Sequence, residues 1–288
     1  MGVLNVTPDS FSDGGLWFDT GDAVAHGFDL LAQGADIVDV GGESTRPGSV
    51  RVDEAEELRR VVPVTRELAA AGVVVSVDTM RASVAEAAIE AGAALINDVS
   101  AGQMDSDMLG TAARTGAPIV LMHWRGLLER ADASYHYTDV AAEVRAELSR
   151  RVEVAVEAGV RPAQIVLDPG PGFSKNAGHN WQLLAHLEEF LDLPFPFLVA
   201  VSRKKFLSTL LAPGPDAAAS VADRDSATAA VTTLAARAGA WAVRVHEPRA
   251  SRIAAEVARA VTFAAASDRD GETVPPPADT HVFGRNDR

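Results

Sequence analysis

The sequence predicts a single (β/α)8 TIM barrel, an α/β fold in which eight parallel strands alternate with helices around one closed sheet. Eight short runs rich in Val, Ile and Leu recur along the 288-residue chain, separated by longer amphipathic stretches. The runs are too short for helices and apolar throughout, as are strands buried on both faces of a parallel sheet. Eight such units match the size of a closed barrel. An open, doubly wound sheet has the same periodicity, so the periodicity does not decide whether the sheet is closed.

The expected elements follow one another in regular order. Strands are expected at residues 1–6, 36–40, 73–77, 93–97, 118–122, 164–167, 196–201 and 240–245. Helices are expected between them, for example at residues 53–70, 80–91, 139–158 and 226–238. Helical stretches end in a glycine, which accepts the left-handed backbone of a helix C-terminus, at Gly34, Gly72, Gly92, Gly159 and Gly239. Residues 1–265 are therefore expected to form one domain. Residues 266–288 contain three consecutive prolines and many charges, and they predict a disordered C-terminal tail.

The composition excludes several classes of protein. Lys and Arg total 26 against 40 Asp and Glu, and this formal charge of −14 argues against nucleic-acid and anionic-membrane partners. The chain has no cysteine, which excludes disulfides, thiolate zinc sites and a cysteine nucleophile. No apolar run approaches the roughly 20 residues of a membrane span, and the start lacks the layout of an export signal. We therefore expect a cytoplasmic protein with small-molecule partners.

Polar residues stand at the end of every expected strand, where barrel enzymes place their chemistry. They are Asn5, Asp39, Asp78, Asn97 with Asp98, His123, Asp168, Ser202 with Arg203 and Lys204, and Arg244 with His246. Any one of them would serve as a helix cap, since Asp and Asn are common at that position. Their occurrence at all eight strand ends favours one shared site at a single mouth of the barrel.

Two of the connections at this mouth are long and rich in glycine. They span residues 5–15, which include Phe11, and residues 41–48, which include Arg46 and Pro47. Loops of this kind beside a site often close over a substrate.

Two further segments suggest the walls of a pocket. The turn at 168–175 lacks the Gly-Lys-Ser/Thr ending of a phosphate loop, so we interpret it as a wall carrying Asp168 and Phe173, with Lys175 as a solvated charge. The segment 201–206 opens a helix, whose N-terminus favours an anion. It holds two of the three lysines of a chain that has 23 arginines.

Two long motifs resemble the signatures of the dihydropteroate synthase family of pterin-binding enzymes. They are Asn5-Val6-Thr7-Pro8-Asp9-Ser10-Phe11-Ser12-Asp13-Gly14 and Asp39-Val40-Gly41-Gly42-Glu43-Ser44-Thr45-Arg46-Pro47-Gly48. Shorter elements follow in family order: Ser76-Val77-Asp78-Thr79, Ile96-Asn97-Asp98-Val99-Ser100, Leu121-Met122-His123, Leu167-Asp168-Pro169-Gly170, Ser202-Arg203-Lys204 and Arg244-Val245-His246. The resemblance covers residues 1–265. It implies a transferase of folate biosynthesis that joins 6-hydroxymethyl-7,8-dihydropterin diphosphate to 4-aminobenzoate and releases diphosphate.

The resemblance also implies roles for individual residues. The pterin would be bound by Asp78, Asn97, Asp168 and Lys204, and the diphosphate by Thr45, Arg244, Val245 and His246. The aminobenzoate would be bound by Phe11, Thr45, Pro47, Phe173, Ser202 and Lys204, and the residues closest to the chemistry would be Asp13, Arg46 and Lys204. Asn5 would bind Mg2+, an ion that retains several water ligands and is usually coordinated by substrate phosphates. The family further implies a homodimer and inhibition by sulfonamides.

The implied mechanism follows from the leaving group. Diphosphate held by Mg2+, basic side chains and a helix N-terminus absorbs charge as its bond to carbon breaks, and it leaves a pterin-stabilised cation at the methylene carbon. The arylamine then attacks that carbon. Neither a covalent enzyme intermediate nor a strong base is required, because an aniline nitrogen is already a nucleophile.

Three other functions remain as alternatives. A corrinoid methyltransferase-type barrel would share the pterin grip but need neither the Phe11 loop nor the loop at 44–47. A barrel aldolase would use Lys204 in a Schiff base, which requires a desolvated lysine of lowered pKa, whereas Lys204 stands between Arg203 and Lys205 in the sequence. A catalytically silent paralogue would act as a binding partner in a dimer.

Overall fold

The computed structural model describes residues 1–7, 20–43, 51–126, 135–211 and 219–266. All eight expected strands are present within one or two residues of the expected positions, or as shorter segments inside them. They are β1 (Gly2–Asn5), β2 (Val38–Gly41), β3 (Val75–Asp78), β4 (Leu95–Asp98), β5 (Ile119–Met122), β6 (Ile165–Asp168), β7 (Leu198–Val199) and β8 (Ala242–Val243).

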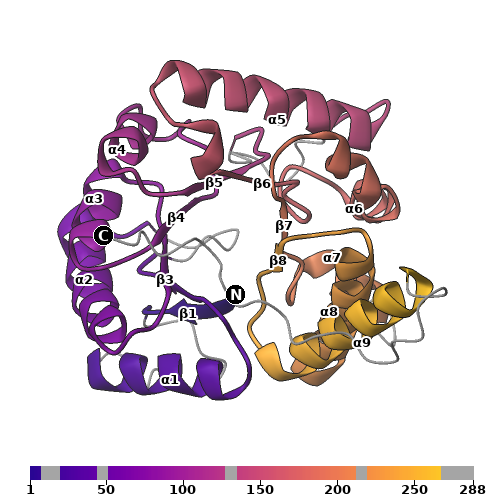
Figure 1. Ribbon diagram of the computed structural model, residues 1–288, viewed down its shortest axis with the longest axis horizontal. Helices are drawn as coiled ribbons and strands as arrows, with labels where there is room; N and C mark the ends of the chain where they lie inside the picture. The colour runs from indigo at the N-terminus through magenta and orange to yellow at the C-terminus, as the bar shows by residue number, and fades with distance from the viewer. Residues whose placement is uncertain (8–19, 44–50, 127–134, 212–218, 267–288) are drawn as a thin grey trace.

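The strands form a closed ring. β1 to β6 make one parallel sheet in chain order, and β7 pairs with β8 in parallel. At one seam the N–H of Leu167 donates to the carbonyl of Pro196 at 2.9 Å, and at the other the N–H of Val3 donates to the carbonyl of Val245 at 2.9 Å. Parallel bridges lie at the same two places. Figure 1 accordingly shows the strands as an inner ring surrounded by helices, and the open-sheet alternative is wrong.

Helices follow the strands and cover the ring. They are α1 (Thr20–Ala32), α2 (Glu54–Ala70), α3 (Ala82–Glu90), α4 (Met108–Thr115), α5 (Val140–Glu157), α6 (Ala177–Ala185), α7 (Lys205–Leu211), α8 (Val221–Arg237) and α9 (Pro248–Ala266), with 3-10 turns at Pro162–Gln164 and Leu187–Asp192. In the part of the chain that the structure describes, these helices lack the combination of length and apolar character that crossing a bilayer requires.

Local sequence signals explain where the helices begin and end. The carboxylate of Asp53 accepts the N–H of Glu56 at 2.8 Å and caps α2. The five expected glycine ends are confirmed, with φ between 81° and 108°. Helix α8 begins at Val221 rather than at the expected residue 226, because Ser220 caps it by accepting the N–H of Asp223 at 3.0 Å. The expected tail at 266–288 lies outside the described residues except for its first residue, which ends α9.

The apolar core divides into two clusters, because alternate side chains of a strand face opposite ways. The larger cluster packs between strands and helices and contains, for example, Val40 and Val77. The smaller cluster fills the floor of the ring interior with Met1, Ile37, Leu95, Val120, Val166, Leu198 and Ala200. Two residues beyond a floor residue, the same strand face carries a polar group on β2, β4 and β6, namely Asp39, Asn97 and Asp168. Strand periodicity therefore aims these groups into the mouth.

Candidate active site

Arg244 connects three strands across the mouth of the barrel. Its Nε donates to Asp39 Oδ2 at 2.6 Å and its Nη2 donates to Asp78 Oδ2 at 2.6 Å. Asn97 Nδ2 donates to the same oxygen of Asp39 at 3.0 Å. Asp39, Asp78 and Asn97 come from β2, β3 and β4, Arg244 directly follows β8, and the four side chains form one contiguous polar group. Asp39 is completely buried at its centre, although the sequence reasoning named it only as a strand-end residue and gave it no role.

The charges in this group depend on one another. Burial raises the pKa of Asp78 to about 7, and the carboxylates of Asp39, Glu57 and Asp98 add to the rise, whereas Arg244 opposes it. The 2.6 Å ion pair shows that the guanidinium stabilises the ionised form of Asp78. Because arginine stays protonated, Arg244 is the residue that allows two buried carboxylates to lie side by side.

A second group gathers around Asp168 at the end of β6. Asp168 is 3% exposed, and its Oδ1 accepts the N–H of Gly170 at 2.7 Å. The ammonium of Lys204 donates to the carbonyl of Pro171 and lies 4.3 Å from the centre of the Phe173 ring. Burial lowers the pKa of Lys204 to about 8, against the attraction of Asp168. The structure therefore brings Asp168, Phe173 and Lys204 together. The resemblance assigns Asp168 to the pterin, Phe173 to the aminobenzoate and Lys204 to both, so this grouping fits two rings bound in contact.

Gly172 makes this arrangement possible. Its φ is +85°, and a Cβ built there would collide with the aliphatic stem of Lys204. Glycine therefore lets the lysine lie flat against the turn and reach both Pro171 and Phe173.

Ser202 and His246 fasten the ends of β7 and β8 together. The N–H of His246 donates to Ser202 Oγ at 3.1 Å, and His246 Nδ1 lies 2.9 Å from the same hydroxyl. Val245 lies in the closing seam, where its N–H donates to the carbonyl of Met1 at 3.0 Å. Ser202 thus positions His246, a contact that the sequence reasoning did not anticipate.

Asn5 offers an oxygen beside the acidic group. A Cβ on Gly41 would lie 3.6 Å from Asn5 Oδ1 and 3.6 Å from Asp78 Oδ2, so the lack of a side chain at Gly41 keeps space between the two oxygens. Within the described ranges, no three His, Cys, Asp or Glu side chains gather closely enough to hold a metal ion. An amide oxygen with room beside it fits Mg2+, which takes few protein ligands and completes its shell with phosphate oxygens and water.

Several residues predicted for the mouth face elsewhere. Asp98 points outward and accepts the N–H of Ser100 at 2.8 Å. His123 also points outward and contacts Glu147 of α5 at 2.9 Å. Arg203 turns away with φ 59° and pairs with Asp225 at 2.7 Å. Asp98 and His123 face outward because successive residues of a strand face opposite sides. The left-handed backbone of Arg203 turns its side chain away. A position at the end of a strand does not by itself predict either effect.

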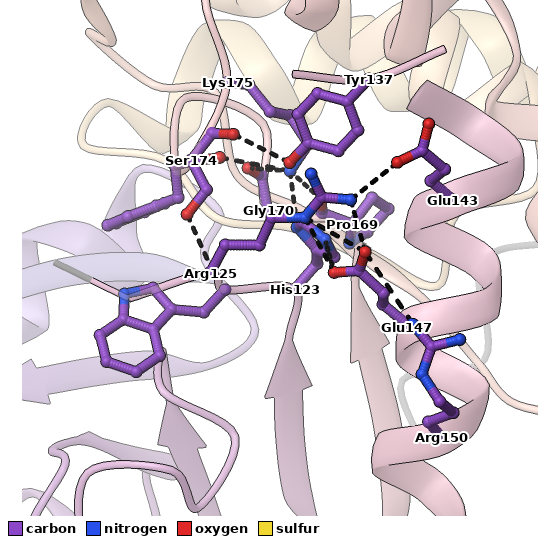
Figure 2. A network of polar contacts seen from close by, with 12 residues as sticks. His123, Arg125, Tyr137, Glu143, Glu147, Arg150, Pro169, Gly170, Ser174 and Lys175 are labelled. Atoms are coloured by element: carbon purple, nitrogen blue, oxygen red, sulfur yellow. Dashed lines mark hydrogen bonds and ion pairs between the residues drawn. The ribbon is translucent and has the colours of Figure 1, made fainter. Parts of the chain in front are cut away.

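The two predictions about lysines are also wrong. Lys175 is not a solvated charge, since its ammonium lies among backbone carbonyls and His123, as Figure 2 shows. Lys204 is desolvated, since burial lowers its pKa, while Arg203 points away and Lys205 is exposed at the start of α7. The remaining predicted site residues, Phe11, Asp13, Thr45, Arg46 and Pro47, lie outside the described residues.

The fold and this site define a class of protein. Inward polar side chains converge at the carboxyl ends of parallel strands in a closed α/β barrel, which is where enzymes of this architecture bind and transform small molecules. The mouth combines three carboxylates with an arginine and a lysine, a donor and acceptor set suited to a flat heterocycle that carries an anionic group.

Comparison with known proteins identifies the family. Residues 1–246 match the family described as pterin binding enzyme. A protein of Mycobacterium leprae (strain TN) named dihydropteroate synthase is 54% identical over 253 residues, which cover 87% of this chain and 89% of the relative. The chain therefore belongs to the pterin-binding enzymes and, within them, to the dihydropteroate synthase family.

Solved structures agree with this assignment. Xanthomonas albilineans dihydropteroate synthase with 4-aminobenzoic acid matches with a TM-score of 0.82 at 43% identity, covering 91% of this chain and 92% of that one. Yersinia pestis dihydropteroate synthase with a sulfonamide drug complex matches with a TM-score of 0.84 at 42% identity, covering 92% of this chain and 93% of that one.

Proposed function

We propose that this protein is a dihydropteroate synthase that condenses 6-hydroxymethyl-7,8-dihydropterin diphosphate with 4-aminobenzoate to give 7,8-dihydropteroate and diphosphate. The observation that carries the proposal is the convergence of Asn97, Asp168 and Arg244, from three separate strands, at one mouth of a barrel of this family. We further propose that the enzyme acts in cytoplasmic folate biosynthesis, with residues 1–265 as its pterin-binding domain and 266–288 as a tail.

The pterin binds between the two groups of the mouth. Asp168 accepts hydrogen bonds from the amidine-like edge of the ring, while Asn97 and Asp78 meet the opposite edge. Burial favours these bonds, since Asp168 and Asn97 are each 3% exposed and water competes little there. Lys204, already lying over Phe173, contacts the ring from the side of the turn.

The diphosphate leaves toward Arg244, His246, Thr45 and the backbone at Val245. A guanidinium has five N–H donors, and the bonds to Asp39 and Asp78 use two of them, so Arg244 can bind a phosphate oxygen while it stays paired. Mg2+ held at Asn5 would supply the charge that neutralises the departing diphosphate. Basic groups fixed in advance where charge develops stabilise the transition state without reorganising.

The 4-aminobenzoate ring packs against Phe173 and beside Lys204 and Ser202, with its amine toward the methylene carbon. Phe11, Thr45 and Pro47, from the two long connections, complete this pocket. Asp13, Arg46 and Lys204 are the residues closest to the reacting atoms. The Xanthomonas albilineans relative solved with 4-aminobenzoic acid supports the choice of nucleophile.

Diphosphate release tests this function directly. We expect release from the pterin substrate to require both 4-aminobenzoate and Mg2+, and a sulfonamide to inhibit it in competition with 4-aminobenzoate. Release that does not depend on 4-aminobenzoate would contradict the synthase assignment, and the absence of any release would favour the catalytically silent paralogue. Methyl transfer from a reduced folate to a corrinoid protein would instead favour the methyltransferase alternative.

The lowered pKa of Lys204 is a specific reason to test the aldolase alternative too. Borohydride with a carbonyl substrate should leave the chain unmodified, because the ammonium of Lys204 is already committed to Pro171 and to the Phe173 ring. A stable covalent adduct at Lys204 would show that it acts as a Schiff-base nucleophile.

Substitution of Gly172 by alanine should weaken substrate binding. The added Cβ displaces the stem of Lys204, and loss of a well-placed contact costs on the order of tenfold in affinity for pterin diphosphate. Gly72→Ala is a matched control, since Gly72 has φ +83° and nothing within 4 Å of an added Cβ. Titration calorimetry should find weaker binding only for Gly172→Ala, and equal affinities in the two variants would refute the contact.

We also propose that the protein is a homodimer that associates through α7, α8 and α9, which lie side by side in Figure 1. Ile253, Val257 and Val261 recur every four residues along α9 and are 58%, 55% and 47% exposed, and Leu234 of α8 is 57% exposed. Exposed apolar side chains on neighbouring helices are typical of subunit contacts. Sedimentation velocity should give twice the 30.2 kDa chain mass, and Ile253→Glu should give the monomer.

A further inference from the structure

The ammonium of Lys175 is enclosed by the turn that follows Asp168. Its Nζ lies 3.0 Å from the carbonyl of Pro169, 3.1 Å from that of Gly170 and 3.3 Å from that of Phe173 (Figure 2). Carbonyl oxygens only accept hydrogen bonds, so a donor at the point where three of them converge stabilises the turn, even though the carbonyl of Gly170 also accepts the N–H of Phe173 at 3.1 Å. Lys175 supplies that donor from within the same segment.

His123 and Glu147 hold Lys175 from the outer side of the barrel. His123 Nδ1 lies 2.9 Å from Nζ, and His123 Nε2 lies 2.9 Å from Glu147 Oε2. Because the ammonium can only donate, Nδ1 accepts, and the hydrogen of the ring therefore resides on Nε2 and is donated to Glu147. Burial lowers the pKa of His123 to about 4, which agrees with a neutral ring between a cation and a carboxylate.

The turn itself has a backbone that needs such support. Gly170, Gly172 and Ser174 all have positive φ, of 65°, 85° and 51°, and Ser174 is not a glycine. Glycine adopts positive φ readily, so the strained residue is Ser174, whose conformation persists only where its surroundings fix it. Lys175 holds the carbonyls of residues 169, 170 and 173 from one side, and Lys204 holds the carbonyl of residue 171 from the other.

The residues that this turn places are those that meet the substrates. Asp168 is fixed through the N–H of Gly170, Phe173 lies at the end of the turn, and Lys204 touches both Pro171 and the Phe173 ring. Lys175 itself contacts none of these side chains in the described hydrogen bonds. It acts on them through the shape of the turn, and its charge also acts through space on Asp168, whose pKa it lowers against the effect of burial.

We propose that Lys175, anchored by His123 and Glu147, is a positioning residue that fixes the turn at 169–173 and so sets the geometry of Asp168, Phe173 and Lys204. The proposal rests on the proposed function, because it takes the roles of these three residues from there. No contact between Lys175 and a substrate is involved.

Lys175→Met tests the proposal, since methionine keeps most of the length of the side chain and removes its donors. We expect KM for 4-aminobenzoate to rise about tenfold or more while kcat changes severalfold less, because a displaced wall and lysine weaken binding first. The wild-type enzyme is assayed in parallel for diphosphate release. A wild type without activity would refute the proposed function, whereas an active wild type with an unchanged KM in Lys175→Met would refute only the positioning role.

Gln164→Leu is the matched control for general destabilisation. Gln164 is 4% exposed at the other end of β6, and its Nε2 donates to the carbonyls of Ala112 and Ala117 at 3.1 and 2.8 Å. Both substitutions strip buried carbonyls of their donor, but only Lys175 lies at the mouth. Both should lower Tm, and only Lys175→Met should raise KM. A similar rise of KM in Gln164→Leu would overturn the proposal.

Two further variants keep the test decisive if Lys175→Met does not fold. Lys175→Gln retains two N–H donors for the carbonyls, and we expect its KM to rise less than that of a variant without a nitrogen donor at this position. An equal rise in the folded glutamine variant would count against the proposal. Because the chain has no cysteine, Lys175→Cys can be alkylated at that one site with 2-bromoethylamine under denaturing conditions and refolded. The restored amine should return KM toward that of wild type refolded in the same way, and failure to do so would contradict the role of its N–H donors.

Discussion

Asp168→Ala is expected to abolish measurable binding of pterin diphosphate. Asp168 lies at the inward end of β6 and would accept two charge-assisted hydrogen bonds, each worth about 1.5–3 kcal/mol. Their loss predicts a dissociation constant raised by roughly two to four orders of magnitude. Burial raises the pKa of Asp168, so its ionised form opposes folding near neutral pH and the variant should fold. Titration calorimetry with the intact substrate measures the change.

Asp98→Ala provides the matched control for this experiment. Asp98 is likewise a buried carboxylate at the end of a strand, but it faces the helices and accepts the N–H groups of Ser100 and Gly102 at 2.8 and 2.6 Å. Its removal should lower Tm and leave the affinity for pterin diphosphate within about threefold of wild type, since no ligand bond is lost. Equal loss of affinity in the two variants would mean that Asp168 acts through stability and not by binding.

Arg244→Met is expected to destabilise the fold strongly even without ligand. It leaves the buried carboxylates of Asp39 and Asp78 beside each other without a cation, and breaking a buried ion pair in this way costs about 3–5 kcal/mol. In a chain of this size that corresponds to a Tm lower by roughly 6–15 °C near neutral pH. Differential scanning calorimetry would detect it.

The pH dependence of this loss has a definite sign. Without Arg244, the folded-state pKa of Asp78 rises beyond the value of about 7 that burial already gives it, while the unfolded value stays near 4. A carboxyl with a raised folded pKa gains stability as pH falls through that pKa, so the deficit of Arg244→Met should shrink between pH 8 and pH 6. The double variant Arg244→Met with Asp39→Asn should recover part of the deficit at pH 8. A deficit independent of pH would show that packing, not charge, is lost.

Local sequence signals account for most of the fold. The eight runs marked the strands because parallel strands buried on both faces must be apolar throughout. Glycines such as Gly72 and Gly159 marked helix ends, because their φ is positive there. The start of α8 was missed although the Ser220 cap is legible in the sequence. Closure depends on pairing between Gly2 and Val245, at opposite ends of the domain, which no local pattern encodes.

The site was predictable as a set of strand ends but not as a set of contacts. The sequence locates the last residue of each strand, but the direction of its side chain depends on the register of the sheet. Asn97 points inward, for example, and its neighbour Asp98 points outward. The charge of Lys175 could not be placed from its neighbours in sequence, because its acceptors include His123, 52 residues away. Asp39 received no role for the same reason, since its importance arises only from meeting Arg244 in space.

The balance of charge across the mouth affects how a substrate arrives. Among its described side chains, Asp39, Asp78 and Asp168 offset Arg244 and Lys204, while the whole chain carries −14. An incoming diphosphate therefore meets repulsion at long range and attraction only within a few ångströms. Dissolved salt screens the repulsion beyond about 8 Å at physiological ionic strength and leaves the close contacts nearly intact. Capture of the anion should accordingly become faster as ionic strength rises, opposite to enzymes that draw anions in with a positive field.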